Sequence, residues 1–222
     1  DGGLQNTMGL TFGSDGNLYV ASSGNDSVLR FDGATGVFQE AFVPSGGGDL
    51  DAPGLGLRFG PDDHLYASST NNHQVVRFHG ESGAYLDAYV PANADSLTNP
   101  DGLVFDGQGT LFVSSGGNDR VLMYDDDVIL PTWQWQAEAT ANGGFGAGDA
   151  VGSRVAFDGD TLVVGAPGDG NGTVKVYVRD DNSTPADLRD DLWTLQATLT
   201  GAGALPGDGF GSGVALDGDL LA

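Results

Sequence analysis

An internal repeat in the first half of the chain is the feature that most constrains how it folds. Residues 9–32 align without gaps with residues 56–79 at a shift of 47, and residues 102–125 follow as a third copy 46 residues later. A fixed period of this length is typical of proteins that repeat one small structural unit. The sequence therefore predicts a repeat fold.

A second repeat type follows after residue 127. Residues 135–140 match residues 193–198 at a shift of 58, and residues 148–160 match residues 207–219 at a shift of 59. We therefore expect a change of repeat type near residue 130. Residues 1–130 hold three units of the first type, and residues 131–222 hold one complete and one truncated unit of the second.

Each unit of the first type reads as four short strands. In the first copy, apolar or β-branched runs occupy residues 9–12, 17–22, 28–32 and 37–43, and turns rich in Asp, Asn and Gly separate them. Such short turns join antiparallel neighbours. A four-stranded meander repeated at this period is the pattern of a β-propeller blade, and a solenoid is the alternative.

Composition narrows the functional classes. The 222 residues include 31 acidic and 8 basic side chains, so the formal net charge is −23. Nucleic-acid phosphates and anionic lipid headgroups repel such a polyanion, so we expect no nucleic-acid partner. No apolar run is long enough to span a bilayer, so we expect no membrane insertion. The absence of cysteine excludes disulfides, thiol catalysis and thiolate metal sites.

Both repeat types resemble known families. The motifs G-L-x-F, D-G-x-L-Y-V and N-D-x-V-x-x-F-D of residues 9–125 resemble the repeats of NHL-type, gluconolactonase and streptogramin-lyase propellers. The motifs V-G-S-R-V-A-F-D-G-D and F-G-S-G-V-A-L-D-G-D of residues 133–222 are similar to FG-GAP repeats of integrin α-subunits and bacterial surface proteins. The resemblance implies an all-β propeller of four-stranded antiparallel blades, with both parts continuous in one ring.

Strand counting gives about four and a half blades, because the last motif breaks off at Ala222. An open blade exposes unpaired backbone groups, which natural folds cover. Three solutions are open: residues 1–8 complete the sheet, the chain is part of a larger ring, or a neighbouring subunit donates the missing strands. We expect the larger ring. Strand donation would instead produce self-association through the incomplete blade.

The NHL resemblance implies a ligand-binding rim. It places the turns between second and third strands on one face, together with the connectors that carry Asp49, Asp51, Asp95 and Asp101. The side chains expected on these turns are Asn25, Asp26, Asn72, His73, Asn118 and Asp119. Such groups bind a cation or accept hydrogen bonds from sugar hydroxyls. The alternative is that they satisfy the backbone of their own turns and tolerate a left-handed φ.

The FG-GAP resemblance implies a calcium loop, because carboxylates alternate along such loops and Ca²⁺ takes six to eight oxygen ligands. The corresponding residues here are Asp158, Asp160, Asp169 and Asn171. Two carboxylates followed by an apolar strand make a reduced cage, and a plain Asp-Gly hairpin is the alternative. Ca²⁺ is the only cofactor that we consider.

We predict no catalytic residue. An enzyme of this kind would need acidic or histidine side chains from several blades to converge. No carboxylate or histidine is present in the expected first strands, residues 10–12, 57–59 and 103–105. All three histidines belong to the second copy, and hairpin register sets His64 opposite His79. This pair either binds Zn²⁺ or Cu²⁺ adventitiously or is the solvated base of a hairpin.

These observations favour an extracellular or cell-surface binding module that presents loops to a protein or carbohydrate ligand, in adhesion or surface assembly. An acidic surface with almost no lysine suits a saline setting, and drift of a Gly- and Asp-rich repeat explains it equally well. Two alternative functions stay open. One is a lactonase- or lyase-type enzyme with its catalytic residues outside this chain, and the other is a structural subunit completed by strand donation.

Overall fold

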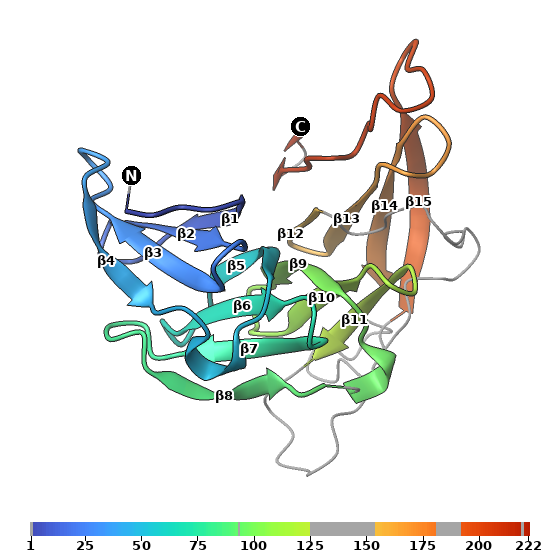
Figure 1. The fold of residues 1–222 in the computed structure, drawn as a ribbon. Helices are drawn as coiled ribbons and strands as arrows, with labels where there is room; N and C mark the ends of the chain where they lie inside the picture. Colours follow the sequence, from blue (N-terminus) through green and yellow to red (C-terminus); the bar gives the residue numbers. More distant parts are fainter. Residues whose placement is uncertain (1, 93, 125–153, 181–191, 219) are drawn as a thin grey trace. The chain divides into compact units, whose positions relative to one another are not determined.

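The computed structural model describes residues 2–92, 94–124, 154–180, 192–218 and 220–222. These residues form antiparallel sheets that follow one another along the chain: three of four strands, one of three and one of two (Figure 1). The expected fold class, an all-β protein built of four-stranded propeller blades, is confirmed. No helix in the described residues is long and apolar enough to cross a membrane.

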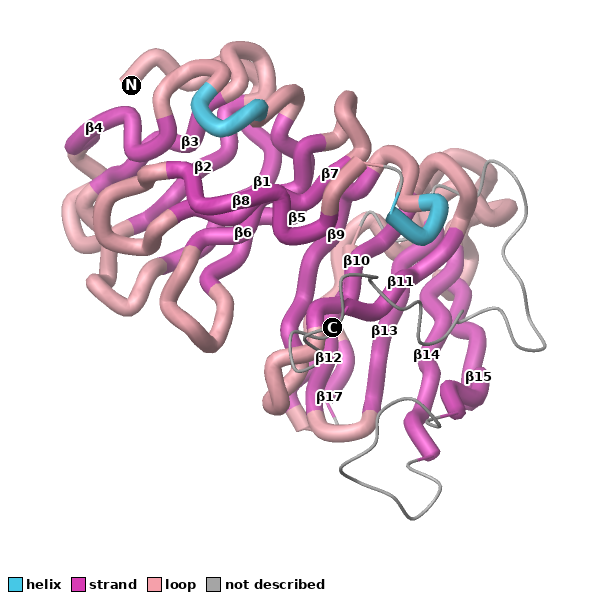
Figure 2. Tube along the Cα trace, turned by 90° about the horizontal axis from the view of Figure 1, so that it is seen from below, coloured by secondary structure: helices cyan, strands magenta, loops and turns pink. Residues whose placement is uncertain are grey.

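The first two blades are complete in the described residues, and each runs from its first to its fourth strand in chain order. Blade one contains β1 (Thr7–Phe12), β2 (Leu18–Ser22), β3 (Ser27–Phe31) and β4 (Phe38–Val43). Blade two contains β5 (Pro53–Phe59), β6 (Leu65–Ser69), β7 (Gln74–Phe78) and β8 (Tyr85–Val90). Each blade is followed by a short 3-10 helix, η1 (Gly47–Asp49) or η2 (Ala94–Ser96), which Figure 2 shows in cyan.

The later sheets repeat the plan in the residues that are described. Blade three contains β9 (Pro100–Phe105), β10 (Leu111–Ser115) and β11 (Arg120–Tyr124). Blade four contains β12 (Val155–Asp158), β13 (Thr161–Ala166), β14 (Thr173–Asp180) and β15 (Leu192–Thr200). A final pair consists of β16 (Leu216–Asp217) and β17 (Leu220–Leu221). The chain forms two compact units, Asp1–Leu103 and Val104–Ala222. The change of repeat type near residue 130 stays a prediction.

The strands of the first copy lie within two residues of their expected positions, because the turns that bound them are specified locally. At the first turn of each blade, the chain takes a positive φ at Gly16 (76°), Asp63 (58°) and Gly109 (102°). Glycine adopts this conformation without steric cost, and aspartate is among the few other residues that tolerate it. The turn geometry is therefore conserved through the three copies although the residue changes.

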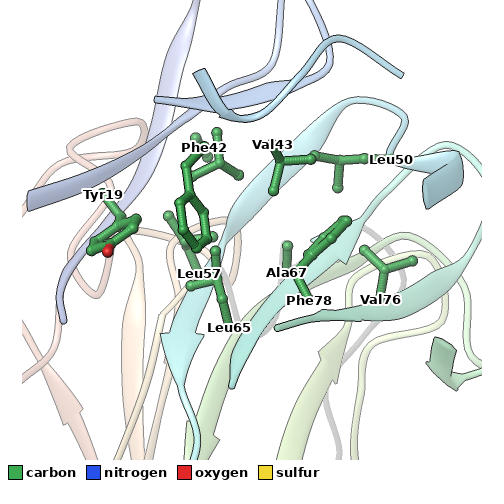
Figure 3. Packing of buried hydrophobic residues seen from close by; sticks show 11 residues of the cluster. Tyr19, Phe42, Val43, Leu50, Leu57, Leu65, Ala67, Val76 and Phe78 are labelled. Carbon is green, nitrogen blue, oxygen red and sulfur yellow. The ribbon is translucent and has the colours of Figure 1, made fainter. Parts of the chain in front are cut away.

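Blades one and two share one apolar core, which Figure 3 shows from close by. Tyr19 of blade one contacts Phe42 and, across the interface, Phe59 of blade two, each edge-to-face with ring centroids 4.9 Å apart. Five side chains of blade two face this layer and are at most 1% exposed: Leu57, Leu65, Ala67, Val76 and Phe78. One face of blade one therefore packs on the opposite face of blade two, and burial of this area stabilises the pair.

The glycines of the first two G-L-x-F motifs, Gly9 and Gly56, lie where first strands approach each other. A Cβ atom on Gly9 would lie 2.6 Å from the carbonyl oxygen of Leu55, and one on Gly56 would overlap the carbonyl oxygen of Asp101. Backbone is rigid at such contacts, so only glycine fits. The motif glycine therefore has a packing role.

The second unit has a core of its own. Phe112, Val121 and Met123 of blade three pack with Leu162, Val164, Tyr177 and Trp193 of blade four. Phe112 stacks on Phe157 at 5.2 Å between centroids and meets Trp193 edge-to-face at 5.4 Å. Aromatic pairs of this kind add to the energy of simple area burial.

Candidate functional site

The expected rim residues lie on the turns between second and third strands. The last residue of each turn has a left-handed φ: 53° at Asp26, 60° at His73 and 58° at Asp119. Asn, Asp and His are the non-glycine residues most often found there. Local backbone geometry is thus one reason for these residue types.

Two of these left-handed residues brace the next blade. The Ala52 N–H donates to Asp26 Oδ1 over 2.8 Å, and the Asn99 N–H donates to His73 Nδ1 over 3.0 Å. Each donor lies 26 residues after its acceptor, just before the first strand of the following blade. We call these two hydrogen bonds the inter-blade braces. They use the side-chain atoms that a ligand at the rim would otherwise meet.

The rim asparagines are also used within the protein. Asn25 donates to the carbonyl oxygen of Gly3 (3.2 Å) and accepts from Ser27 Oγ (2.8 Å), and Asn72 donates to the carbonyl oxygen of Asp49. Asn118 and Asp119 lie on the equivalent turn between β10 and β11. In blades one and two these residues adopt the left-handed φ of the alternative, but their side chains mostly bond to other segments rather than to the backbone of their own turns. Ligand binding at the rim stays a prediction.

Of the connector carboxylates, Asp51 accepts from the Asn71 amide (2.9 Å) and Asp101 accepts from the Leu55 N–H (2.9 Å). The Asp49 carbonyl oxygen accepts from Ser69 Oγ (3.2 Å). The side chain of Asp95 lies outside the described residues. Each of these described connector groups thus accepts a hydrogen bond from another segment of the protein.

The four residues expected to bind calcium are spread over several contacts. Asp158 accepts a hydrogen bond from the Gly218 N–H, and Asp160 Oδ1 pairs with Arg179 at 2.6 Å. Asp169 accepts from Thr173 Oγ1 (3.0 Å), and Asn171 donates to the carbonyl oxygen of Ala204 (2.7 Å). Among the described residues, no group of three or more His, Asp or Glu side chains converges as metal ligands. A calcium site stays a prediction.

The predicted histidine pair is confirmed as a cross-strand neighbour pair. Ser69 pairs with Gln74 in the register of β6 and β7, and the rings of His64 and His79 follow with centroids 5.3 Å apart. His64 Nδ1 accepts from the Gly80 N–H (3.4 Å), and His79 Nδ1 lies 3.2 Å from Ser82 Oγ. Both rings thus contact the turn between β7 and β8, beside the ends of the paired strands β6 and β7.

The second unit contains a pocket of about 550 Å³ that sequence reasoning did not find. It lies where the first hairpin turns of blades three and four meet. The lining residues are Phe105, Asp106, Gly107, Gln108, Phe157, Asp158, Gly159, Asp160 and Arg179. We call it the hairpin pocket. Its volume is within the range of small-molecule sites, which combine an apolar lining with a few placed polar groups.

Arg179 holds the polar side of the hairpin pocket together. Its side chain is 11% exposed, and its Nε and Nη2 donate to Asp160 Oδ1 over 3.0 and 2.6 Å. Its Nη1 donates to Gln108 Oε1 over 3.1 Å. The guanidinium thus joins the two hairpin turns and is neutralised by one carboxylate, in a charge-assisted contact of the stronger class.

Sequence reasoning recognised the turn at Asp158 and Asp160 but not its partner. Gln108 and Arg179 are 71 residues apart and belong to different blades. The available signal was the position of Gln108 in its blade. It lies in the first hairpin turn of blade three, and Asp158 and Asp160 lie at the equivalent turn of blade four. Equivalent turns of adjacent blades are the places where side chains of neighbouring repeats can meet.

Comparison with known proteins gives one sequence family and many structures. An FG-GAP repeat model matches residues 133–178, and no curated protein matches the chain. Virginiamycin B lyase from Staphylococcus aureus has a TM-score of 0.59 at 15% identity, covering 96% of this chain and 60% of that one. A chain of the nidogen–laminin complex has a TM-score of 0.64 at 16% identity, covering 98% and 71%.

A gluconolactonase from Xanthomonas campestris has a TM-score of 0.60 at 13% identity, covering 88% of this chain and 62% of that one. The chain therefore spans less than two thirds of the length of the lyase and the gluconolactonase. At such identities the likeness shows the fold alone. The chain has a β-propeller fold and contains an FG-GAP repeat.

Proposed function

We propose that the protein is a non-enzymatic, extracellular binding module whose protein or carbohydrate ligand occupies the hairpin pocket. The observation that carries this proposal is the lining of the pocket, where aromatic side chains stand beside polar groups that are already fixed by one another. A ligand then meets groups whose ordering entropy is already lost, and this preorganisation favours affinity.

The two aromatic walls support the same function. Phe157 is half-buried and stacks on Phe112, so its ring is held in one orientation while its remaining surface lines the pocket. Phe105 is also half-buried and lines the pocket from blade three. Rigid aromatic surface beside hydrogen-bonding groups is the usual composition of a specific binding site.

The extracellular setting is supported by the repeat type and the charge. FG-GAP repeats occur in integrin α-subunits and bacterial surface proteins, and the net charge of −23 keeps the chain soluble by repulsion between copies. The nidogen–laminin complex shows that a chain of similar fold is found with a protein partner. A protein or carbohydrate partner outside the cell suits both observations.

A plugged pocket tests the proposal. Gly107 lines the pocket, has a φ outside the left-handed region, and a Cβ there would meet no atom within 4 Å. Gly107→Trp should therefore fill the pocket without disturbing the fold. Gly213 has the same open surroundings outside the pocket, so Gly213→Trp is the matched control.

The labelled chain is applied to a glycan array and to an array of extracellular-protein peptides. We expect ligands that bind the natural chain and Gly213→Trp but not Gly107→Trp. Binding that survives in Gly107→Trp would overturn the role of the pocket. Turnover of a lactone or a cyclic peptide ester by the chain would overturn the non-enzymatic function in favour of the lactonase or lyase alternative.

A further inference from the structure

We propose that the hairpin pocket binds a neutral saccharide. This inference names the ligand class for the function proposed above and rests on that function. Three features of the lining favour such a ligand: its charge, its mixture of hydrogen-bond donors and acceptors, and its aromatic walls.

The charge of the lining disfavours anionic ligands. Three carboxylates, those of Asp106, Asp158 and Asp160, line the pocket with one guanidinium, that of Arg179, so the formal charge is −2. Arg179 is already paired with Asp160, and its covered side chain offers little positive charge to a ligand. Acidic sugars and phosphorylated ligands would be repelled at short range, and the net charge of the chain acts in the same direction.

The hydrogen-bonding groups suit hydroxyls, which donate and accept. Within the described residues, Asp158 Oδ1 and Asp160 Oδ2 accept no hydrogen bond and can receive one from a ligand. Gln108 uses its Oε1 to accept from Arg179, which leaves its Nε2 amide as a donor on the exposed side of the turn. An ammonium group could use the acceptors only, whereas sugar hydroxyls use both kinds of group.

The aromatic walls complete the match. Phe105 and Phe157 line the pocket beside these polar groups, and Phe157 is held by Phe112 and by Trp193, whose ring centroid lies 6.1 Å away. The C–H faces of a sugar ring are apolar and pack on such fixed aromatic rings. The hydroxyls of the sugar can at the same time reach the polar groups of the hairpin pocket. A flat neutral ring with hydroxyls at its edge therefore uses every part of the lining.

The test follows backbone amide shifts of the ¹⁵N-labelled chain at Gly107, Gln108 and Gly159 during titration. The neutral probes are the methyl glycosides of glucose, galactose and mannose, and the comparison probes are galacturonic acid and a lysine-containing peptide. We expect at least one neutral glycoside to move these three amides saturably, and galacturonic acid to bind at least about ten-fold more weakly.

Two variants separate a specific site from general surface effects. Gln108→Ala removes the amide donor, and with it the acceptor that Gln108 offers to Arg179, and should weaken the neutral glycoside at least about five-fold. Gln39→Ala removes an equally exposed glutamine that makes one hydrogen bond, to Asn17 at 3.2 Å in blade one, and should leave the affinity within two-fold. Gly107→Trp should abolish the shifts.

Equal effects of Gln108→Ala and Gln39→Ala would overturn the saccharide inference. So would stronger binding of galacturonic acid than of every neutral glycoside. If only the lysine peptide moves the pocket amides, the inference fails and the pocket still binds, so the proposed function stands. If array ligands bind Gly107→Trp as well as the natural chain, the proposed function itself fails.

Discussion

Blades one and two carry a polar network on the face where blade three is apolar. Tyr66 Oη donates to Asp62 (2.9 Å), and Arg77 lies 3.6 Å from Asp62 and pairs with Asp87 at 2.6 Å. Blade one repeats this network with Tyr19, Asp15, Arg30 and Glu40. At the three positions of the third copy that match Tyr66, Asp62 and Arg77 stand Phe112, Gln108 and Met123.

The loss of this network is what makes Gln108 available to the hairpin pocket. In blades one and two the turn carboxylate is held by the tyrosine and arginine of its own blade. Phe112 has no hydroxyl and Met123 no charge, so the amide of Gln108 bonds instead to Arg179 of blade four. The same backbone therefore supports either a closed network within a blade or an open polar site between two blades.

Arg77→Met places in blade two the residue found at the matching position of blade three, Met123. Of the changes considered, it should have the largest effect on stability. Burial opposes ionisation of Arg77, but its hydrogen bonds with Asp87 and Tyr66 outweigh burial and raise its pKa. Removing the guanidinium leaves half-buried oxygens unpaired, so we expect a loss of about 2 kcal/mol. Urea unfolding measures it.

The control for this change is Arg58→Met, an exposed arginine of the same blade, for which we expect less than about 0.5 kcal/mol. Adding Tyr66→Phe and Asp62→Gln to Arg77→Met should recover part of the loss, because blade two then carries the same three residues as blade three, and neither the Tyr66 hydroxyl nor the Asp62 carboxylate is left without the arginine. If the triple variant is no more stable than Arg77→Met, the two faces are not interchangeable.

His73→Ala tests the inter-blade brace where a histidine replaces the aspartate of blade one. It removes the acceptor for the Asn99 N–H and places alanine at a φ of 60°, so we expect a loss of about 1.5 kcal/mol. His73→Asp restores the acceptor found at Asp26 and should recover most of it. Thermal or urea unfolding of the three proteins decides the matter, and equal stability of both variants would contradict the brace.

Tyr177 of blade four differs from the tyrosines of blades one and two. Its buried hydroxyl has no hydrogen-bond partner among the described residues, whereas the hydroxyls of Tyr19 and Tyr66 do. Burial raises the pKa of Tyr177 to about 12. The folded state therefore keeps the proton that the unfolded state releases near pH 10, so stability is full below pH 10 and falls as the pH rises toward 12. The loss amounts to about 1.4 kcal/mol at pH 11.

Tyr177→Phe should be neutral or slightly stabilising at pH 8, because no hydrogen bond is lost. It should also unfold less readily than the natural chain at pH 11. Urea titrations at the two pH values give the comparison. An equal loss of stability with pH in both proteins would show that Tyr177 does not contribute to it.

The smallest effect concerns the third turn of blade one. The side-chain hydroxyl and N–H of Thr35 donate to Asp32 Oδ1, both over 2.7 Å, and lower the pKa of Asp32. The stabilisation from this ionised form is present at neutral pH and is lost as the pH falls through the lowered pKa. Thr35→Ala should raise the pKa of Asp32 toward its ordinary value, which an NMR titration of its carboxyl carbon measures. No change would show that the backbone bonds suffice.

Much of the fold could be predicted because it is encoded locally. The Asp-Gly and Asn-Asp turns fix where strands end, and the register that pairs Ser69 with Gln74 follows from the length of one turn. The inter-blade braces at Asp26 and His73 were harder to predict, since their donors lie 26 residues later in the chain, just before the next blade. The hairpin pocket depends on Gln108 and Arg179, which are 71 residues apart and lie in two different blades. No periodicity specifies such a pair.

The inter-blade braces also favour folding of the blades in the order in which the chain is synthesised. Because Asp26 precedes Ala52, and His73 precedes Asn99, each finished blade presents its acceptor before the next first strand leaves the ribosome. A nascent chain can therefore add one blade at a time onto a folded template, without holding a long unpaired segment open. Duplicating blade two within the gene would extend this template by one step, since this copy brings both a donor, the Ala52 N–H, and an acceptor, His73.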